Sequence, residues 1–249
     1  MIRASCFVIL MSGHSKWSKI KHEKEAKDIV KGNVFSKLSK HITLAVIEGG
    51  GITDPGNNIK LRLAIEKARS LNMPKGNIER AIEKGTGPEK SQLKEVVYEG
   101  FAPGGVAIII VATTDNQNRT LSEIKSVVHM HGGKLGGSGS VSYLFKRCAV
   151  MRFNKEQISQ DQVFSAASEI EAFDVDEDEK EYRLYFPYDH LGKIKTEFGG
   201  IKPKSIESIF KAESSITVDS GTAEKIQSLM LELESLDDVS GTYGNYQTS

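Results

Sequence analysis

The order of helical and strand patterns constrains the fold of this chain more than any other feature of its sequence. Between residues 34 and 85, apolar residues recur at intervals of three and four, which is the spacing of amphipathic helices. From residue 96 onward, runs rich in Val and Ile alternate with further helical patterns. Residues 86–91, with Gly, Pro and Ser, separate the two regions. We therefore predict an α+β protein, and a length of 249 residues indicates two or three domains.

The N-terminal region predicts three short helices. The first runs from about Val34 to Glu48, with Asn33 as its N-cap. The second follows Asn58, and the third opens at Pro74 and stops at Gly85. Each helix carries one apolar stripe, so the three can bury their stripes against one another as a small bundle.

The remainder predicts two α+β units. A hairpin (96–111), a helix (119–131) and a strand (141–145) come first. From Cys148 the order is strand, helix, strand, strand, helix and strand, the ferredoxin-like pattern, with the second helix expected at His190–Phe198.

A helix (222–236) and a strand (239–246) then remain and would complete the interrupted first unit. We predict that the chain divides as follows: residues 1–11 an extension or an early start, 12–87 a basic arm and helical domain, 88–147 with 213–249 a discontinuous α+β domain, and 148–212 an inserted ferredoxin-like domain.

The stretch from Ser12 to Gly32 is the strongest candidate for a functional site. It contains the only tryptophan, Trp17, and only three acidic residues. Several cations release counterions from a phosphate backbone, and one flat ring can stack on a base. The basic candidates for nucleic-acid contact are Lys16, Lys19, Lys21, Lys24, Lys27 and Lys31, together with His14 and His22.

The apolar residues of this stretch, Ile20, Ile29 and Val30, do not share one helical face. We therefore interpret it as an exposed arm that becomes ordered on its partner. Composition alone supports a solvated lysine-rich tail equally well.

The net charge of zero hides an uneven distribution. Residues 12–90 hold 16 Lys and Arg against 9 Asp and Glu, which is +7, and residues 91–249 hold 16 against 24, which is −8; Arg3 supplies the remaining +1. The basic N-terminal part and the acidic remainder indicate that one domain, the N-terminal one, binds a polyanion. Six basic residues on the predicted helices either extend this footprint or form an ordinary solvated face: Lys60, Arg62, Lys67, Arg69, Lys75 and Arg80.

Other motifs fail on inspection. The glycine-rich residues 132–140 precede a predicted strand, whereas a Walker A loop opens a helix. The acidic residues 174–179 lack the glycine and the final glutamate of a calcium loop. His129 and His131 have no third ligand nearby. For the stretch 115–120 the default interpretation is a turn and helix cap, with Asn118 as the N-cap, and exposure of Arg119 to an anion is the alternative.

Targeting, redox and catalytic signals are equally weak. The two cysteines show no metal-ligand spacing, which fits a reducing cytoplasm, and no apolar run has transmembrane length. Residues 1–11 lack the features of a complete signal peptide, so we expect Met11 to be the true first residue. No nucleophile–base or metal-hydrolase motif is present. We expect no catalytic residues, no metal, no cofactor and no small-molecule substrate.

Five segments in order resemble the YebC/PmpR family of bacterial proteins, related to the mitochondrial translational activator of cytochrome c oxidase. They are GHSKW (13–17), MPKGNIERAIEKGTG (73–87), YEGFAPGG (98–105), DNQNRT (115–120) and GGKLGGSGSVSYLF (132–145). The resemblance covers residues 12–246. Ala149 stands where the family is expected to have a glycine, a departure within a strand.

The resemblance implies a helical N-terminal domain and two α+β domains, the third inserted in the second. It also implies a cytoplasmic regulator that binds promoter DNA or acts on the ribosome as a translation factor. By position, Gly13, His14, Ser15, Lys16 and Trp17 would contact the nucleic acid.

Nucleic acid is therefore the expected partner, with no membrane, and we take a monomer as the working assumption. The alternative is a protein-interaction module whose acidic α+β domains bind a protein partner, with a basic arm that only solubilises the chain.

Overall fold

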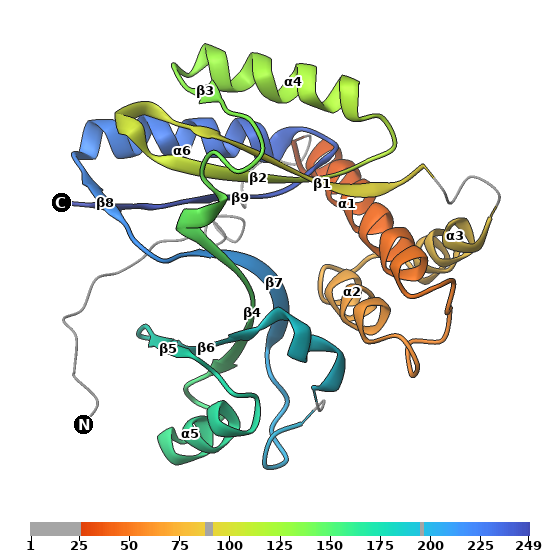
Figure 1. Ribbon diagram of the computed structural model, residues 1–249. Helices are drawn as coiled ribbons and strands as arrows, with labels where there is room; N and C mark the ends of the chain where they lie inside the picture. Colours follow the sequence, from red (N-terminus) through yellow and green to blue (C-terminus); the bar gives the residue numbers. More distant parts are fainter. Residues whose placement is uncertain (1–25, 88–91, 195–196) are drawn as a thin grey trace.

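The computed structural model describes residues 26–87, 92–194 and 197–249, and for residues 26–32 and 192–193 it describes the backbone alone (Figure 1). The elements, with η for 3-10 helices, are α1 (Ala26–Glu48), α2 (Ile59–Ser70), α3 (Lys75–Thr86), β1 (Lys94–Phe101), η3 (Pro103–Gly105), β2 (Ala107–Thr114), α4 (Gln117–Met130), β3 (Lys134–Leu135), η4 (Ser142–Leu144), β4 (Phe145–Asn154), α5 (Gln160–Glu169), β5 (Asp174–Glu177), β6 (Glu181–Pro187), η5 (Tyr188–Lys193), β7 (Ser205–Ala212), β8 (Ile216–Val218), α6 (Ser220–Ser235), β9 (Val239–Gly244) and β10 (Tyr246–Thr248).

Helices α1, α2 and α3 form the helical domain. Their apolar stripes meet in one buried cluster that includes Ile42, Leu61 and Ile78. Helix α3 lies close against α1, since a Cβ atom on Gly85 would stand only 2.6 Å from the Cβ of Val46. The hydroxyl of Thr43 donates to the carbonyl oxygen of Ala81 at 2.8 Å and joins the same two helices.

Helix α1 begins earlier than its sequence pattern predicts. It starts at Ala26 rather than Val34, so Asn33 lies inside the helix and is not its N-cap. Adding residues to a helix that is already anchored costs little, because each new residue gains one hydrogen bond. The weak helix formers Gly32 and Asn33 are therefore overridden by the packed part of the helix that follows them.

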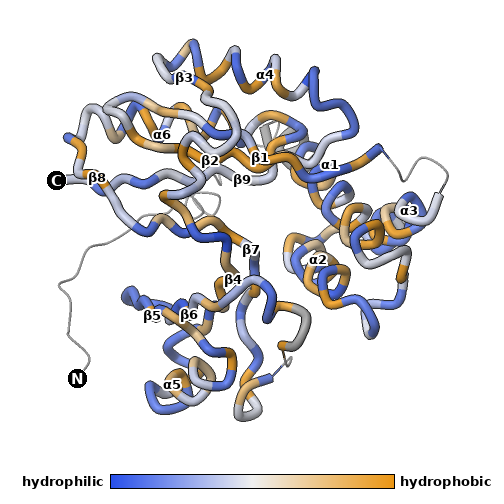
Figure 2. Tube along the Cα trace, in the orientation of Figure 1, coloured by the Kyte–Doolittle hydropathy of each residue, from blue (hydrophilic) through white to orange (hydrophobic). Residues whose placement is uncertain are grey.

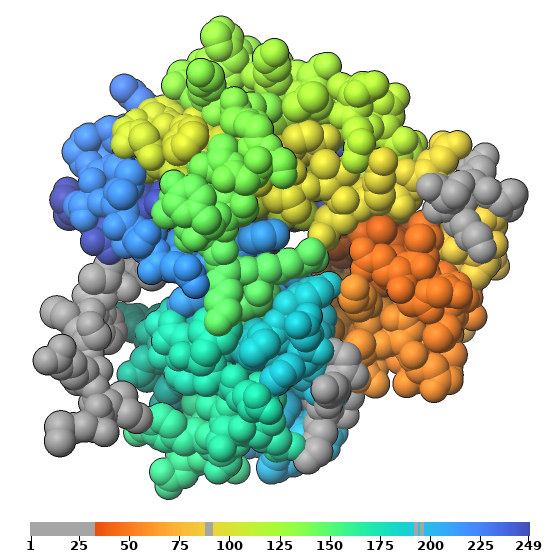
Figure 3. Space-filling model, viewed as in Figure 1, coloured from red at the N-terminus to blue at the C-terminus, as the bar shows by residue number. Residues whose placement is uncertain are grey.

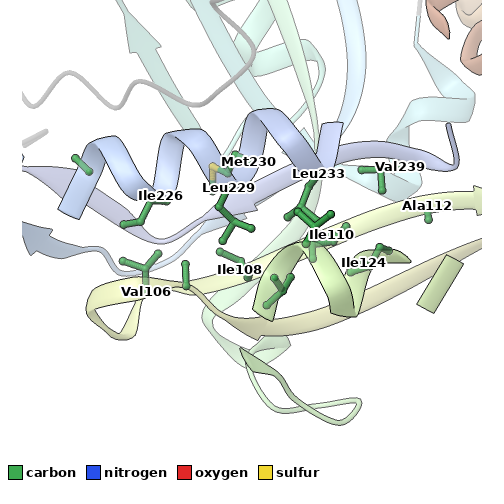
Figure 4. Close-up of a cluster of buried hydrophobic side chains, with 14 of the residues drawn as sticks. Val106, Ile108, Ile110, Ala112, Ile124, Ile226, Leu229, Met230, Leu233 and Val239 are labelled. Carbon is green, nitrogen blue, oxygen red and sulfur yellow. The ribbon is translucent and has the colours of Figure 1, made fainter. Parts of the chain in front are cut away.

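The second domain is a four-stranded antiparallel sheet in the order β3-β1-β2-β9. Helices α4 and α6 cover one face of it, and their side chains pack onto Ile108, Ile110 and Ala112 of β2 (Figure 4). Strand β2 is buried along its whole length and is strongly hydrophobic (Figure 2). Strand β9, from the end of the chain, pairs with β2, so the two halves of this domain come from distant parts of the sequence.

The third domain interrupts the second. Its antiparallel sheet has the order β5-β6-β4-β7, which is the ferredoxin-like arrangement, with α5 packed on one face. The paired strands β4 and β7 run between the two domains (Figure 1). Phe145 and Phe210, near the ends of these strands, pack below the sheet of the second domain. The α+β architecture predicted from the sequence, with a ferredoxin-like domain inserted in a second α+β domain, is therefore confirmed.

Two local predictions are wrong. The helix expected at His190–Phe198 is instead the short 3-10 helix η5, since Gly192 weakens the pattern and Leu191 is already buried within the first turn. The strand expected at 141–145 is a 3-10 turn followed by β4. The backbone N–H groups of Val141 and Ser142 bond a glutamate side chain and so are not available to a strand ladder.

Candidate nucleic-acid interface and the contacts that position it

The predicted contact residues fall largely outside the described residues. Gly13, His14, Ser15, Lys16, Trp17, Lys19, Lys21, His22 and Lys24 all lie there. Lys27 and Lys31 belong to the first turns of α1, where the backbone is described. One continuous helix therefore joins the end of the basic stretch to the helical domain.

The next two lysines of α1 contact the second domain. Lys37 Nζ donates to the carbonyl oxygen of Glu234, and Lys40 Nζ donates to that of Asp237 at 3.1 Å. Glu234 lies in the last turn of α6, where a cation is stabilised by the unpaired carbonyl groups and the helix dipole. Burial lowers the pKa of Lys37, although Glu234 and Asp237 oppose this. These two lysines therefore serve domain contact.

Asp238 is the centre of this contact. Its carboxylate is 3% exposed and accepts from Lys40 Nζ at 2.5 Å and from Arg119 at 2.9 Å. The hydroxyl groups of Thr120 and Thr114 donate to it at 2.6 and 3.1 Å. Burial alone would raise the pKa of Asp238, but the bonds from Lys40, Thr120 and Arg119 hold it well below its ordinary value.

The stretch 115–120 thus has a structural role that the sequence only partly predicted. Its helix cap is Asn116, not Asn118, because the Asn116 side chain accepts from the N–H of Arg119. Arg119 does not stand free for an anion, since it also bonds Asp115 at 2.9 Å. Both of its ionic partners belong to the second domain.

Helix α2 contacts the third domain through two other lysines. Lys67 pairs with Glu207 of β7 at 2.9 Å. Lys60 pairs with Glu48 at 2.7 Å and lies over the ring of Tyr188 at 5.4 Å.

Arg147 extends these contacts to the second domain. Its guanidinium group stacks on the same Tyr188 ring at 4.4 Å and pairs with Glu95 of β1 at 2.8 Å. Tyr188 of the third domain is thus contacted by Lys60 of the helical domain and by Arg147, which also pairs with the second domain, so the three domains meet at this point.

His41 lies partly buried at this junction, and we expect it to make stability fall at acid pH. Burial, assisted by Lys67 and Lys37 and opposed by Glu207, lowers its pKa from 6.5 to about 4. Between about pH 6.5 and pH 4, the imidazole of His41 is protonated in the unfolded chain but stays neutral in the folded protein. The free energy of unfolding therefore falls as the pH falls through this window.

The test compares urea unfolding midpoints of the parent and of His41→Gln across this pH range. The parent should lose more stability than the variant between pH 6.5 and 4. The exposed His129, changed to Gln, is the control and should follow the parent. Parallel curves for the parent and His41→Gln would contradict the expectation.

The exposed basic residues of the helical domain gather at the end of α2 and along α3. Apart from Lys67, which pairs with Glu207, they are Arg69, Lys75, Arg80 and Lys84. Glu79 and Glu83 share the exposed surface of α3 with them, and Lys75 pairs with Glu79 at 3.6 Å. The solvent face of α3 therefore carries nearly balanced charges, whereas lysines outnumber acidic residues six to three in the stretch 12–32.

The glycine-rich stretch 132–140 is held by the chain itself. The buried carboxylate of Glu99 accepts from the backbone N–H groups of Gly139, Val141 and Ser142, each at 2.8 Å. Burial alone would raise the pKa of Glu99, but these bonds lower it. These three backbone N–H groups are therefore occupied by a side-chain carboxylate and are not free to bind a phosphate.

Other candidate groups show no ligand-binding arrangement. In the described ranges, no cluster of three or more His, Cys, Asp or Glu could hold a metal ion. Asp174 and Asp176 of the acidic hairpin bond Lys211. Cys148 is buried, which raises the pKa of its thiol to about 11. None of the helices described is both long and apolar enough to span a bilayer.

The fold defines a class of protein: a helical N-terminal domain followed by two α+β domains, of which the third is ferredoxin-like and is inserted in the second. Two family models match this chain, "TACO1/YebC protein N-terminal domain" over residues 15–88 and "TACO1/YebC second and third domain" over residues 93–246. The chain belongs to the TACO1/YebC family.

Full-length relatives agree with this assignment. A protein of Brachyspira hyodysenteriae is 42% identical over 244 residues, which cover 95% of this chain and 97% of the relative. One of Aquifex aeolicus is 42% identical over 241 residues, which cover 95% and 96%. Both are named "Probable transcriptional regulatory protein". The crystal structure of a conserved hypothetical protein from Aquifex aeolicus has a TM-score of 0.77 and 39% identity, and covers 94% of this chain and 98% of its own.

Proposed function

We propose that this protein is a cytoplasmic regulator of gene expression that binds nucleic acid through residues 12–32. The observation that carries the proposal is the separation of charge, +7 over residues 12–90 against −8 over residues 91–249. The names of its relatives support a regulatory role.

The ion pairs of the helical domain sharpen the proposal. Lys37, Lys40, Lys60 and Lys67 are engaged in contacts with the other domains or with Glu48. The basic excess left for a ligand therefore lies mainly in residues 12–32, where six lysines face three acidic residues. Each lysine that neutralises a phosphate releases counterions, so binding should weaken steeply with salt.

The target is either promoter DNA, for a transcriptional regulator, or ribosomal RNA, for a translation factor. A helix that reads the major groove presents a face of donors and cations to the bases. The exposed face of α3 mixes Glu79 and Glu83 with its basic residues, which does not favour such readout. A lysine-rich arm with one stacking ring suits structured RNA at least as well.

Crosslinking in growing cells separates these targets. The protein is crosslinked to nucleic acid, purified under denaturing conditions, and the attached nucleic acid is sequenced. Ribosomal RNA clustered in one region identifies a translation factor, and discrete promoter DNA identifies a transcriptional regulator. A protein partner that is retained without nucleic acid after deletion of residues 11–32 would instead favour the protein-interaction module.

Charge reversal of Lys16, Lys21 and Lys24 to Glu should reduce affinity for nucleic acid by at least about a hundredfold and lower the salt slope by about three. Affinity falls because the variant loses three lysine–phosphate contacts and gains three carboxylates that repel the phosphates. Fluorescence anisotropy at one fixed salt concentration measures the affinity, and the same titration repeated over a series of salt concentrations gives the salt slope. Charge-neutralising changes at Asp176 and Glu177 should leave binding unchanged.

A matched control reverses three exposed lysines elsewhere, Lys125, Lys180 and Lys225, and so makes the same change in net charge. This control should bind far more tightly than the arm variant. Equal affinities of the arm variant and the parent would overturn the proposed site, and equal losses in both triple variants would reduce it to a net-charge effect.

A further inference from the structure

We propose that the second domain carries a separate stacking site for an unpaired nucleotide, built from Val97, Phe101, Lys134 and Tyr143, which we call the β1 platform. The inference rests on the proposed function, because it adds a second contact to the same nucleic-acid partner. It concerns described residues only, none of which belongs to the basic stretch.

Tyr143 is the most exposed large apolar or aromatic side chain of the described residues, at 70%. It lies in η4, directly after Val141 and Ser142, whose N–H groups bond the carboxylate of Glu99. The backbone that carries Tyr143 is therefore tied to β1. A ring held in this way loses little conformational freedom when a ligand stacks on it.

Two neighbours of Glu99 on β1 lie on the face of the sheet that the segment 139–142 contacts through the Glu99 carboxylate. Val97 and Phe101 lie two residues to either side of Glu99 and so share its face of the sheet. They remain 38% and 39% exposed, although this face is otherwise packed against β4 and β7. Lys134 of β3 pairs directly with Phe101, so the two side chains stand beside one another.

The position of this surface leaves it accessible. The segment that follows β3 lies at the front of the molecule, between the upper and lower lobes (Figure 3). Lys134 has no ion-pair partner within residues 26–87, 92–194 and 197–249. Gly137 and Gly139 open onto free space, so another backbone can approach closely.

This combination favours an unpaired nucleotide. The ring of Tyr143 can stack on a base, and the side chains of Val97 and Phe101 add apolar surface. The ammonium group of Lys134 can form an ion pair with the phosphate. A paired base is already stacked on both faces within its duplex, so the platform selects single-stranded nucleic acid.

The test measures binding of a fluorescein-labelled oligouridine to the full chain at one fixed salt concentration. Tyr143→Ala should weaken binding by about tenfold, because stacking on one base is lost. Tyr143→Phe should bind like the parent, since the ring remains. The control is Phe164→Ala, which removes an aromatic side chain that is 54% exposed on α5 of the third domain. It should leave affinity unchanged.

A crosslinking experiment locates the contact directly. A photoreactive phenylalanine analogue at position 143 should attach to the oligouridine, and the same analogue at position 164 should not. A parent-like affinity of Tyr143→Ala, an equal loss in Tyr143→Phe, or a crosslink from position 143 in cells to protein alone would overturn the platform.

The arm variant separates this proposal from the proposed function. If the lysine reversal loses binding while Tyr143→Ala does not, the platform fails and the regulator stands. If the parent binds no nucleic acid at all, both proposals fail.

Discussion

Asp238→Asn should lower the free energy of unfolding by about 3 kcal/mol, the largest effect on stability that we expect from any single substitution in this protein's domain contacts. The carboxylate is buried and accepts four hydrogen bonds, two of them from cations. The amide keeps the shape of the side chain but loses its charge, and its NH₂ group would face donors. Lys40 would then have no carboxylate to hold α1 against the second domain.

The measurement is urea unfolding followed by far-UV circular dichroism. Circular dichroism is preferred to tryptophan fluorescence because it reports on the helices and strands of all three domains, whereas the single tryptophan, Trp17, reports on one position only. The adjacent and exposed Asp237, changed to Asn, is the control and should shift stability by less than about 0.5 kcal/mol.

A double-mutant cycle then tests the pair. Lys40→Met combined with Asp238→Asn should cost less than the sum of the two single changes, because both remove one interaction. Full additivity, or a stability of Asp238→Asn equal to that of Asp237→Asn, would contradict this account of the contact.

Glu99→Gln should lower the free energy of unfolding by about 2 kcal/mol. The ionised carboxylate accepts three backbone N–H groups, whereas a single amide oxygen cannot satisfy all three in the same geometry. The segment 136–143 should also lose protection in hydrogen exchange. The binding surface at Tyr143 would become less ordered as a result.

The control is Glu95→Gln, on the same face of the same strand. Glu95 is more accessible and makes a single ion pair, with Arg147, so this change should cost less than about 1 kcal/mol. Because the pKa of Glu99 is lowered on folding, its contribution is present above the ordinary value of 4.5 and is lost as the pH falls. The difference between parent and Glu99→Gln should therefore narrow below about pH 4.5. A constant difference would contradict the role assigned to the charge.

Much of the fold could be predicted from local patterns. The three amphipathic helices, the glycines after them and the strand–helix alternation all reflect contacts between residues near in sequence. The domain insertion could be inferred from the order of elements, because one helix and one strand remained after the βαββαβ unit was complete and would fit the interrupted domain before it. What failed were boundaries. Helix α1 starts earlier than its pattern predicts because the packed part of the helix extends it, and the turn at 142–144 replaces a strand because the distant Glu99 bonds the backbone there.

The candidate sites divide in the same way. The basic character of residues 12–32 is a property of composition, and the family resemblance placed five of its residues at the nucleic acid. The role of Asp238 had no local signal, since its partners Lys40 and Arg119 lie 198 and 119 residues away. Tyr143 was equally inconspicuous, as an ordinary residue in a predicted strand.

The sequence by itself determined the α+β class, the helical N-terminal domain and the separation of charge, because periodicity and composition are readable along the chain. Only the tertiary structure decided which lysines join domains, which carboxylate holds the glycine-rich stretch, and which aromatic side chain stays exposed. Those outcomes depend on packing between segments far apart in the sequence. Where such a contact is buried, as at the carboxylates of Asp238 and Glu99, the ionic and hydrogen-bonding interactions are strong enough to fix the side chain in place.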